Sequence, residues 1–524
     1  MNPSTALPHV VIVGGGIAGL AAAFFLRDEP VRVTVLEGSS RLGGKLSVSE
    51  VAGVPVDEGA EALLVTRPEG TGLIAEAGLA GDRVAPGTTS SAIWTLGALR
   101  PLPRRQFMGV PSDLAELAQS GVVSGAGVAR ASQDLELPPT TRDGDVPVAA
   151  FVGARFGAEV VDRLVDPLLG GVYAGRSSDL SFDATMPALA AASRRYRSLA
   201  EAAGSLLPPP SPVAVPAAPG EQDRGARAGT RSGGSVFTTL SGGLGQLPAV
   251  LAKASGAEVR TAAMTRALSP APGASAPGAL GAQAAGPGWR LTVGSAAAEE
   301  LIDADAVILA VPARPAARLL AGVPGASAAV TAFDEISYAS MAIVTLAYPR
   351  SAFPGAFPGA FSGPFSGSGL AALGWSGYLV PAVDGRAVKA VTFSSVKWPH
   401  LAEATAPGAE PLEIVRCSVG RIGEEALLQR ADEELAALAA AELAAATAVR
   451  GAPVAHRITR WGGALPQYTI GHLDRVARIR AAVATQRGLA VCGAAYEGVG
   501  IPACVATARA AASQVTEFLR GGRQ

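Results

Sequence analysis

Residues 9–37 read HVVIVGGGIAGLAAAFFLRDEPVRVTVLE, and this stretch decides the fold. The apolar run His9–Val13 predicts a strand, and the small residues of Ile17–Arg27 predict a helix that follows a glycine-rich turn. Val31–Leu36 predicts a second strand, which ends at Glu37. Predominantly apolar strands are typical of a parallel sheet that helices cover on both faces. We therefore predict an α/β fold that begins with one βαβ unit.

The glycine-rich turn has the spacing of a dinucleotide-binding loop. Gly14, Gly16 and Gly19 fit the pattern GxGxxG, which allows a tight turn, a close approach of backbone to a pyrophosphate, and close packing of helix on strand. The helix N-terminus adds partial positive charge. Glu37 follows Gly19 by 18 residues, where a carboxylate can accept hydrogen bonds from ribose hydroxyls. A bare GxGxxG also occurs in ordinary turns, but the order of strand, loop, helix, strand and acid favours a dinucleotide.

Composition limits the class of protein. With 524 residues, 49% of them hydrophobic and 17% charged, the chain is long enough for two or three packed units. Its net charge of −1 argues against binding to nucleic acid and against a polybasic membrane-binding patch. The three cysteines show no CxxC spacing and the four histidines no metal-ligand spacing, so we predict free thiols and no metal site.

The apolar run Val10–Leu26 has the length of a signal peptide. However, no Lys or Arg precedes it, three adjacent glycines interrupt it, and it is short for a membrane span. We therefore predict a cytoplasmic protein without a membrane span, and peripheral contact with a membrane stays open.

The rest of the chain alternates between regular patterns and biased segments. Residues 206–234 are rich in Pro, Ala and Gly and predict a flexible loop, and residues 269–288 and 353–369 look like similar insertions. The regular patterns predict helices over Ser112–Gln119, Val148–Leu169, Asp432–Arg450 and Ile501–Leu519, and strands over Val307–Val311 and Leu489–Cys492.

The residues after Glu37 indicate which dinucleotide binds. Residues 38–45, Gly-Ser-Ser-Arg-Leu-Gly-Gly-Lys, resemble the E-x-x-x-R-x-G-G-[KR] extension of the amine-oxidase-like flavoproteins, whose cofactor is FAD. Its glycines would let the backbone pass beside the ribityl-pyrophosphate, where Arg41 and Lys45 add positive charge. The alternative is a basic surface turn. Residues 57–62, Asp-Glu-Gly-Ala-Glu-Ala, resemble the family's loop beneath the isoalloxazine ring.

A second glycine-rich turn, Gly493–Pro502, has a physical argument of its own. Pro502 suits the first turn of a helix, because an N–H there would have no partner within the helix. Such a helix would direct its positive end at a bound group, and a reduced flavin is anionic around N1 and O2. The alternative is an ordinary turn of an α/β domain.

Further segments are similar to one family more narrowly, the protoporphyrinogen/coproporphyrinogen oxidases. Asp166–Gly175 is similar to its P-x-x-x-G-[VI]-[YF]-A-G segment, and Thr392–His400 to its strand rich in phenylalanine, serine and proline. Trp461–His472 is similar to its W-x-x-A-x-P-Q-Y-x-x-G-H motif. Leu102–Pro111 looks more like the coproporphyrinogen-using branch, whose segment reads M-P-x-x-x-x-M-G-[IV]-P.

The resemblance implies a set of site residues. Contacts to FAD carry over to Gly14, Gly15, Gly16, Ile17, Ala18, Gly19, Glu37, Gly38, Arg41, Lys45, Gly59, Ala60, Glu61, Ala62, Val259, Trp461, Val499, Gly500 and Ile501. Among them, Val259 would be the backbone neighbour of adenine. Coproporphyrinogen carries propionates, so Arg104 and Arg105 are candidates to bind it, although exposed arginine pairs are usually only solvated. No histidine or carboxylate is predicted as a base.

The family also implies an architecture. A Rossmann-like FAD-binding domain is expected from residues 1–70, 235–312 and 455–524. An inserted α+β substrate-binding domain is expected from residues 71–91 and 313–454, and a helical subdomain over residues 92–205, before the flexible loop 206–234.

The reaction that the resemblance implies is the six-electron aromatisation of coproporphyrinogen III to coproporphyrin III in haem biosynthesis. The flavin is reduced in three two-electron cycles, and O₂ reoxidises it each time and leaves as hydrogen peroxide. Protoporphyrinogen IX oxidation is the near alternative, and an amine oxidase or carotenoid desaturase a more distant one. A non-catalytic protein that binds FAD or porphyrin is the alternative outside enzymes. The implied partners are the tetrapyrrole and O₂, with transient contact to haem-pathway enzymes and no nucleic acid.

Overall fold

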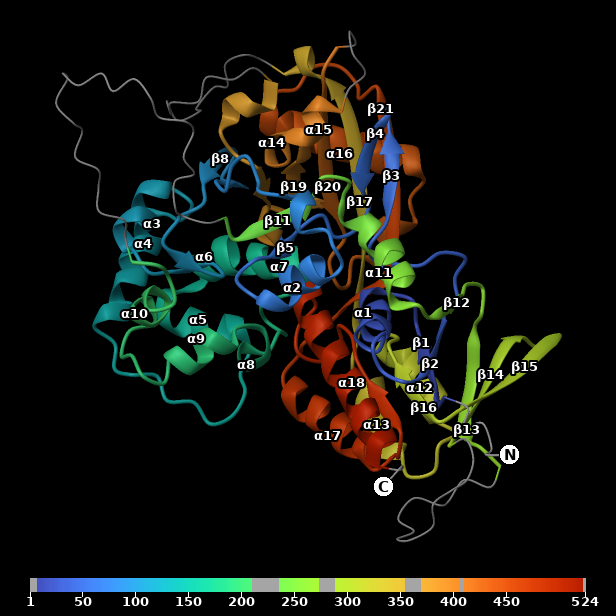
Figure 1. The fold of residues 1–524 in the computed structure, drawn as a ribbon. Coiled ribbons are helices and arrows are strands. Elements are labelled where there is room, and N and C mark those ends of the chain that lie inside the picture. Colours follow the sequence, from blue (N-terminus) through green and yellow to red (C-terminus); the bar gives the residue numbers. More distant parts are fainter. Residues whose placement is uncertain (1–6, 210–234, 273–287, 354–368, 405–409, 522–524) are drawn as a thin grey trace, which may run out of the picture.

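The chain folds into layers that confirm the predicted α/β class. The computed structural model describes residues 7–209, 235–272, 288–353, 369–404 and 410–521. Figure 1 shows a parallel sheet with helices on both sides, a larger sheet above it, and a group of helices mostly to the left. The greater part of the three predicted insertions, residues 210–234, 273–287 and 354–368, lies outside the described residues.

The parallel sheet has five strands in the order β12-β2-β1-β16-β22. They are β1 (His9–Val13), β2 (Arg32–Leu36), β12 (Glu258–Arg260), β16 (Ala306–Leu309) and β22 (Leu489–Val491). Successive side chains of a strand point to opposite faces, so β1 divides its side chains between two cores. Val10 and Ile12 pack in one core, and Val11 and Val13 pack in the other.

Helices and a small sheet cover the two faces, as apolar strands require. The core around Val10 and Ile12 is closed by α1 (Ile17–Phe25), α2 (Pro68–Glu76), α11 (Leu247–Ser255) and α18 (Ile501–Gly521). The opposite core is closed by α12 (Ala313–Leu320), α13 (Ser327–Asp334), α17 (His472–Ala484) and the antiparallel strands β13 (Thr265–Pro270), β14 (Trp289–Ser295) and β15 (Ala298–Ala304). The predicted βαβ unit is confirmed as β1-α1-β2 within this sheet.

The larger sheet has seven strands in the order β21-β17-β20-β19-β18-β7-β8, and every pair except β18–β7 is antiparallel. They are β7 (Ala92–Thr95), β8 (Ala98–Pro101), β17 (Tyr338–Pro349), β18 (Gly377–Leu379), β19 (Val388–Phe393), β20 (Leu412–Val419) and β21 (Ala455–Pro466). Leu435, Ala439 and Leu443 of α16 (Asp432–Thr447) recur at helical spacing and pack in the core of this sheet.

The helical group contains α3 (Leu114–Ser120), α4 (Gly125–Ser132), α5 (Val148–Phe156), α6 (Ala158–Val160), α7 (Asp166–Tyr173), α8 (Phe182–Thr185), α9 (Pro187–Ala192) and α10 (Leu199–Gly204). The helix predicted over Val148–Leu169 is interrupted, because Gly157 adopts a φ of +86° between α5 and α6. Buried Asp134 joins distant parts of the group, since it pairs with Arg155 and accepts from Ala200 N–H at the start of α10.

Short elements connect these layers near the parallel sheet. They are the hairpin β3 (Val48–Val51) and β4 (Val54–Asp57), the three-stranded sheet β5 (Leu63–Leu64), β11 (Phe237–Leu240) and β6 (Arg83–Val84), the pair β9 (Gln106–Phe107) and β10 (Val110–Pro111), and the helices α14 (Ser394–Lys397) and α15 (Pro399–Glu403). They position several side chains of the site described below.

Sheet membership differs from the predicted division of the chain at two places. Residues 92–101, expected in the helical subdomain, form β7 and β8 at one edge of the seven-stranded sheet. Residues 455–466, expected in the FAD-binding domain, form β21 at the opposite edge. A strand carries much the same local signal in whichever sheet it pairs, so its sequence does not decide between two sheets. The other boundaries stay a prediction.

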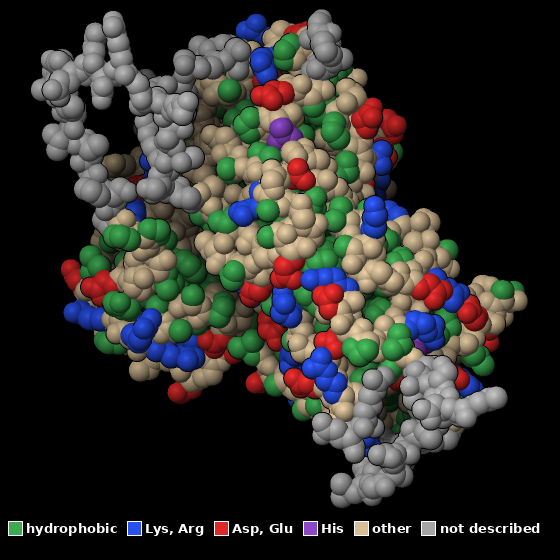
Figure 2. Space-filling model, in the orientation of Figure 1, with side chains coloured by type: hydrophobic (Ala, Val, Ile, Leu, Met, Phe, Trp, Pro, Cys, Tyr) green, Lys and Arg blue, Asp and Glu red, His purple; other side chains and the backbone are tan. Residues whose placement is uncertain are grey.

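The surface carries both signs of charge. On the face that Figure 2 shows, basic and acidic side chains lie interspersed, in keeping with the net charge of −1. Among the described helices, none combines the length and the apolar character that crossing a membrane requires.

Candidate functional site

The predicted glycine loop lies at the carboxyl end of β1, the edge where ligands bind in open parallel sheets. Two of its glycines are needed for packing: a Cβ on Gly14 would lie 2.6 Å from the carbonyl oxygen of Ala310, and one on Gly19 would lie 1.9 Å from that of Gly14. Gly16 differs, because no described atom lies within 4 Å of the position that its Cβ would take. The loop therefore has an open side at Gly16, next to the N-terminus of α1.

Glu37 follows β2 and binds the glycine loop directly. Its Oε2 accepts a hydrogen bond from Gly15 N–H at 2.8 Å, and its Oε1 accepts one from Ser39 N–H at 2.8 Å. A carboxylate has about four lone-pair sites, so both oxygens can still accept from ribose hydroxyls. Val259 lies on the neighbouring strand, because β12 pairs with β2 through Val259 and Val35. The structure thus places one of the two residues predicted for the adenosine end on β12 and the other directly after the adjacent strand β2.

The two predicted cations of the following loop have different surroundings. Arg41 donates to the carbonyl oxygens of Leu42 and Gly44 at 3.2 and 2.8 Å, and its guanidinium carbon lies 5.6 Å from the ring centroid of Trp461. Arg41 therefore supports the backbone of its own loop. The side-chain ammonium of Lys45 has no hydrogen bond or ion pair with the described residues, and desolvation by the surrounding protein lowers its pKa. Its side chain is solvent-accessible although protein surrounds it.

Residues 59–62 pass close to this loop. A Cβ on Gly59 would lie 2.0 Å from the carbonyl oxygen of Lys45, and Ala60 N–H donates to the same oxygen at 3.3 Å. The indole N–H of Trp461 donates to the carbonyl oxygen of Glu58 at 3.0 Å. The loop after Glu37, the loop 59–62 and Trp461 are far apart in the sequence, and the fold brings them together.

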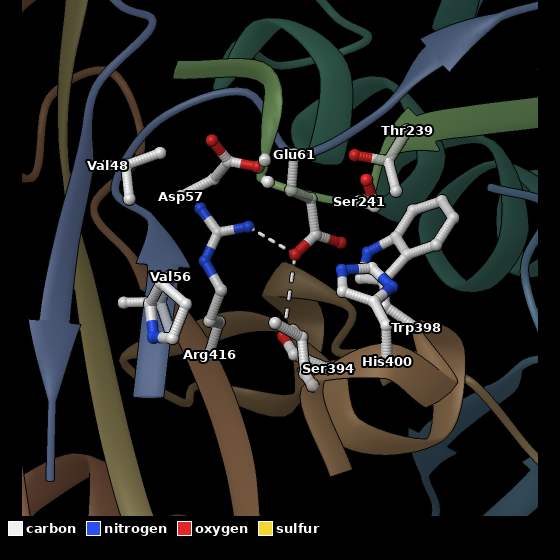
Figure 3. Close-up of a pocket in the computed structure, with 14 residues that line it drawn as sticks. Val48, Val56, Asp57, Glu61, Thr239, Ser241, Ser394, Trp398, His400 and Arg416 are labelled. Atoms are coloured by element: carbon white, nitrogen blue, oxygen red, sulfur yellow. Dashed lines mark hydrogen bonds and ion pairs between the residues drawn. The ribbon is translucent and has the colours of Figure 1, made fainter. Parts of the chain in front are cut away.

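Glu61 is held in a cluster of opposite charges, of which Figure 3 draws the partner Arg416. Its carboxylate, 12% exposed, accepts from Lys397 Nζ at 2.8 Å and from the guanidinium of Arg416. Burial opposes the ionisation of Glu61, but the attraction of Lys397 and Arg416 prevails and lowers its pKa to about 2. Arg416, on β20, also donates to the carbonyl oxygen of Gly59 at 2.6 Å. The cluster therefore fixes the loop 59–62 against the seven-stranded sheet.

A small cavity lies beside this cluster and is lined in part by Asp57, Trp398 and His400 (Figure 3). Its volume of about 20 Å³ is enough for one water molecule. In the described part of the chain, the indole nitrogen of Trp398 and Nδ1 of His400 are buried without a hydrogen-bond partner. Asp57 accepts from Leu244 N–H at 3.0 Å and from Gly245 N–H at 2.9 Å, yet burial outweighs these bonds and raises its pKa to about 6.

Asp57→Asn is expected to remove a pH dependence of stability. The pKa of Asp57 is about 6 in the folded chain and 3.8 ordinarily, so the folded chain holds the proton more tightly than the unfolded chain. Its contribution to the free energy of unfolding is complete below its ordinary pKa and is lost as the pH rises through about 6, by roughly 3 kcal/mol. Urea unfolding across this range should show the loss in the wild type relative to Asp57→Asn. Equal pH profiles would contradict the burial of this carboxyl group.

The C-terminal turn follows β22 and leads into α18. Because β22 and β1 are parallel strands of one sheet, this turn and the glycine loop lie at the same edge. A Cβ on Gly493 would lie 4.0 Å from the Cβ of Ala18. Helix α18 begins at Ile501, and Pro502 follows in its first turn, as predicted. The first amides of a helix have no partner within it, so this turn offers donors to a bound group.

The described side-chain partners of the segment Arg104–Arg105 are not residues of the predicted flavin site. Their backbone N–H groups donate to the carboxylate of Glu116, both at 2.8 Å, and the guanidinium of Arg105 donates to the carbonyl oxygen of Pro208 at 2.6 Å. These contacts belong to α3 and to the residues after α10. The role of the two arginines toward a substrate stays a prediction.

The sequence prediction missed the residues that hold the loop 59–62. Arg416 is the clearest case, because it is the single basic residue of the strand LEIVRCSV and is 7% exposed. A charged side chain is almost never buried unless it is paired, so an arginine in an apolar strand signals a carboxylate partner. Lys397 lies in the segment compared above with the oxidase family, but that comparison assigns it no role.

The chain is similar over nearly its whole length to proteins named coproporphyrinogen III oxidase. The Mycobacterium tuberculosis protein of that name is 35% identical over 517 residues, which cover 97% of this chain and 97% of that protein. The Bacillus subtilis protein of that name is 29% identical over 527 residues, which cover 98% of each chain.

Solved structures agree in fold. A protein from Exiguobacterium sp. 255-15, described as a candidate protoporphyrinogen oxidase, has a TM-score of 0.76 at 26% identity and covers 97% of this chain and 99% of its own. The cyclohexylamine oxidase of Brevibacterium oxydans IH-35A has a TM-score of 0.63 at 15% identity, covers 98% of this chain and all of its own, and shows the fold alone. The family model described as flavin containing amine oxidoreductase matches residues 17–516. With that match over most of its length, the chain belongs to the flavin containing amine oxidoreductase family, and its cofactor is a flavin.

Proposed function

We propose that the chain binds FAD and uses it to oxidise coproporphyrinogen III to coproporphyrin III with O₂. The observation that carries this proposal is the similarity over nearly the full chain to proteins named coproporphyrinogen III oxidase, at 35% identity for the M. tuberculosis protein. The site geometry supports it, because loops from distant parts of the sequence meet at the edge of the parallel sheet where dinucleotides bind.

The residues present fit the dinucleotide. The open side at Gly16 and the ammonium of Lys45, which has no partner among the described residues, suit an extended anionic group near the N-terminus of α1. In this assignment, the loop Gly14–Gly19 holds the pyrophosphate, Glu37 accepts from the adenosine ribose, and Val259 neighbours adenine. The flavin end lies against Gly38, Lys45, Gly59, Ala60, Glu61, Ala62, Trp461, Val499, Gly500 and Ile501, with Arg41 supporting the loop between.

Bound FAD supplies a two-electron acceptor that O₂ can reoxidise. Conversion of coproporphyrinogen III to coproporphyrin III removes six hydrogen atoms, so one porphyrin requires three O₂ and yields three H₂O₂. The chain's own residues hold and orient the reacting groups: the amides at the start of α18 stabilise negative charge, and the cluster around Glu61 fixes the loop 59–62.

Protoporphyrinogen IX is the second candidate substrate. The Macaca fascicularis protein named protoporphyrinogen oxidase is 29% identical to this chain over 537 residues. Coproporphyrinogen III carries more propionates than protoporphyrinogen IX does. A site that binds these extra propionates loses hydrogen bonds when it binds protoporphyrinogen IX, and each lost hydrogen bond to a charged group costs about 1.5–3 kcal/mol. We therefore expect kcat/KM to favour coproporphyrinogen III by about tenfold or more.

Side-by-side turnover of the two porphyrinogens tests this proposal. Protein reconstituted with FAD is given each substrate, porphyrin is followed by fluorescence, and peroxide is measured in parallel. Faster turnover of protoporphyrinogen IX would overturn the assigned substrate. Yellow protein that makes no peroxide would favour a non-catalytic binding protein, and turnover of amines or carotenoids would favour the more distant enzymes.

Two further proposals concern the cell. We propose a cytoplasmic location, with peripheral membrane contact as the alternative, and transient contact with enzymes that supply the porphyrinogen or take up the porphyrin. Cell fractionation with an antibody against the chain tests the location. Cross-linking in lysate, compared with and without added porphyrin, tests the contact.

A further inference from the structure

Two stacked rings lie where the chain passes from β21 into α17. Tyr468 and His472 have ring centroids 3.8 Å apart and planes inclined by 14°, and both are buried, at 1% and 0% exposure. Burial lowers the pKa of His472 to about 4, so its ring is neutral at neutral pH. Because the interior is closely packed, the two rings have little freedom to move, and the backbone groups that they bind are held in place.

Both rings bind the backbone of the turn 494–498. The hydroxyl of Tyr468 donates to the carbonyl oxygen of Ala494 at 2.6 Å and accepts from Gly498 N–H at 2.8 Å. Nε2 of His472 lies 3.0 Å from the carbonyl oxygen of Tyr496, so that nitrogen carries the proton and donates. Three hydrogen bonds from one stacked pair therefore fix three backbone groups of a five-residue turn.

This turn leads directly into the start of α18. Gly498 adopts a φ of +144°, and a Cβ there would lie 2.8 Å from the Cβ of Ala503. The direction of the following amides, at Val499–Ile501, thus depends on how Gly498 is held. The hydroxyl of Tyr468 accepts from Gly498 N–H, immediately before those amides.

The same segment also binds the helical group. The side-chain amide of Gln467 donates to the carbonyl oxygen of Tyr173 at 2.7 Å, and the carbonyl oxygen of Tyr468 accepts from Ser181 N–H at 2.8 Å. The ring of Tyr173 lies 5.4 Å from that of Tyr468. Residues 467–472 therefore have contacts with α7 on one side and with the turn before α18 on the other.

We propose that Tyr468 is a positioning residue that sets the orientation of the Val499–Ile501 amides toward the flavin, with His472 supporting it. Because these amides would face a group that becomes anionic on reduction, their orientation changes the relative affinity for reduced and oxidised flavin. The inference rests on the proposed FAD site, and it assigns Tyr468 no direct contact with substrate.

The test compares Tyr468→Phe with Tyr496→Phe. Tyr496 belongs to the same turn and is 1% exposed, but its hydroxyl has no hydrogen-bond partner among the described residues, so it is a matched control for the loss of a buried phenol oxygen. The midpoint potential of the bound flavin and the Kd for FAD are measured in both variants and in the wild type. These readouts do not depend on turnover.

In Tyr468→Phe we expect the ratio of reduced to oxidised flavin at a fixed potential to fall about threefold to tenfold. This is the effect of one neutral hydrogen bond, here the one from Gly498 N–H that holds the following amides. For a two-electron couple this lowers the midpoint potential by about 15 to 30 mV. Tyr496→Phe should keep the wild-type potential.

Equal potentials in the two variants would overturn the inference while leaving the proposed FAD site intact. A wild-type chain that holds no FAD would overturn both. If Tyr468→Phe does not fold, His472→Phe keeps a stacked ring and removes only the bond to Tyr496. It should also lower the potential, and an unchanged potential in that variant would contradict the inference.

Discussion

Gly16→Val should weaken FAD binding severely and leave the chain folded. Gly16 has a φ of −75° and a ψ of 179°, a conformation open to any residue, and no described atom lies within 4 Å of its Cβ position. A valine therefore fits the protein but fills the space that we assign to the pyrophosphate. Loss of two charge-assisted hydrogen bonds weakens binding by about 10²- to 10⁴-fold. The free energy of unfolding of the apoprotein should change by only about 1 kcal/mol.

The matched control is Gly19→Val, three residues further along the same loop. Its Cβ would lie 1.9 Å from the carbonyl oxygen of Gly14, so this change should destabilise the apoprotein itself, by about 3 kcal/mol or more. Titration of each apoprotein with FAD and thermal unfolding separate the two effects. A Gly16→Val protein that binds FAD as tightly as the wild type would show that the pyrophosphate lies elsewhere.

Arg416→Met should lower the free energy of unfolding by about 3–5 kcal/mol, the typical cost of breaking a buried ion pair from one side. The change leaves Glu61, 12% exposed, with Lys397 as its remaining cation, and removes the donor to the carbonyl oxygen of Gly59. Urea unfolding followed by circular dichroism measures the loss. Because the loop 59–62 is then less firmly held, the Kd for FAD should rise as well.

A half-exposed arginine from the same region provides the control. Arg457 binds Glu58 but is itself 49% exposed, and the hydroxyls of Ser47 and Thr459 also donate to that carboxylate, so Arg457→Met should cost less than Arg416→Met. In the double variant Glu61→Gln/Arg416→Met, the total loss should be smaller than the sum of the single losses, because each single change already breaks the same ion pair. Additive losses, or equal losses for Arg416→Met and Arg457→Met, would contradict the buried cluster.

Local patterns predicted the elements around the glycine loop well, and the structure shows why. The strand His9–Val13 has its predicted bounds, and the helices predicted from Ile17 and from Ile501 begin at those residues. Their signals, an apolar run, a glycine turn and a proline in the first helical turn, act within a few residues. The helix predicted to end at Arg450 ends at Thr447 instead, because Ala448 adopts a left-handed conformation that its sequence does not announce.

The parts of the site that depend on distant contacts could not be read from the sequence. Glu61 meets Arg416 across 355 residues, and the periodicity of neither segment indicates its partner. The motif after Glu37 suggested equal roles for Arg41 and Lys45, whereas the structure turns Arg41 toward its own backbone and leaves Lys45 unpaired among the described residues. Such differences arise from packing, which a motif does not encode.

The order of strands in the parallel sheet has a consequence for synthesis of the chain. His9, at the start of β1, donates its backbone N–H to Asp305, which is 296 residues later. At about 5–20 residues per second, a ribosome needs about 15–60 s to make that partner, and longer to make β22. During this time the apolar unit β1-α1-β2 has no neighbours on one edge, which makes it a natural client for a chaperone. We therefore expect the cofactor to bind only after the sheet has assembled.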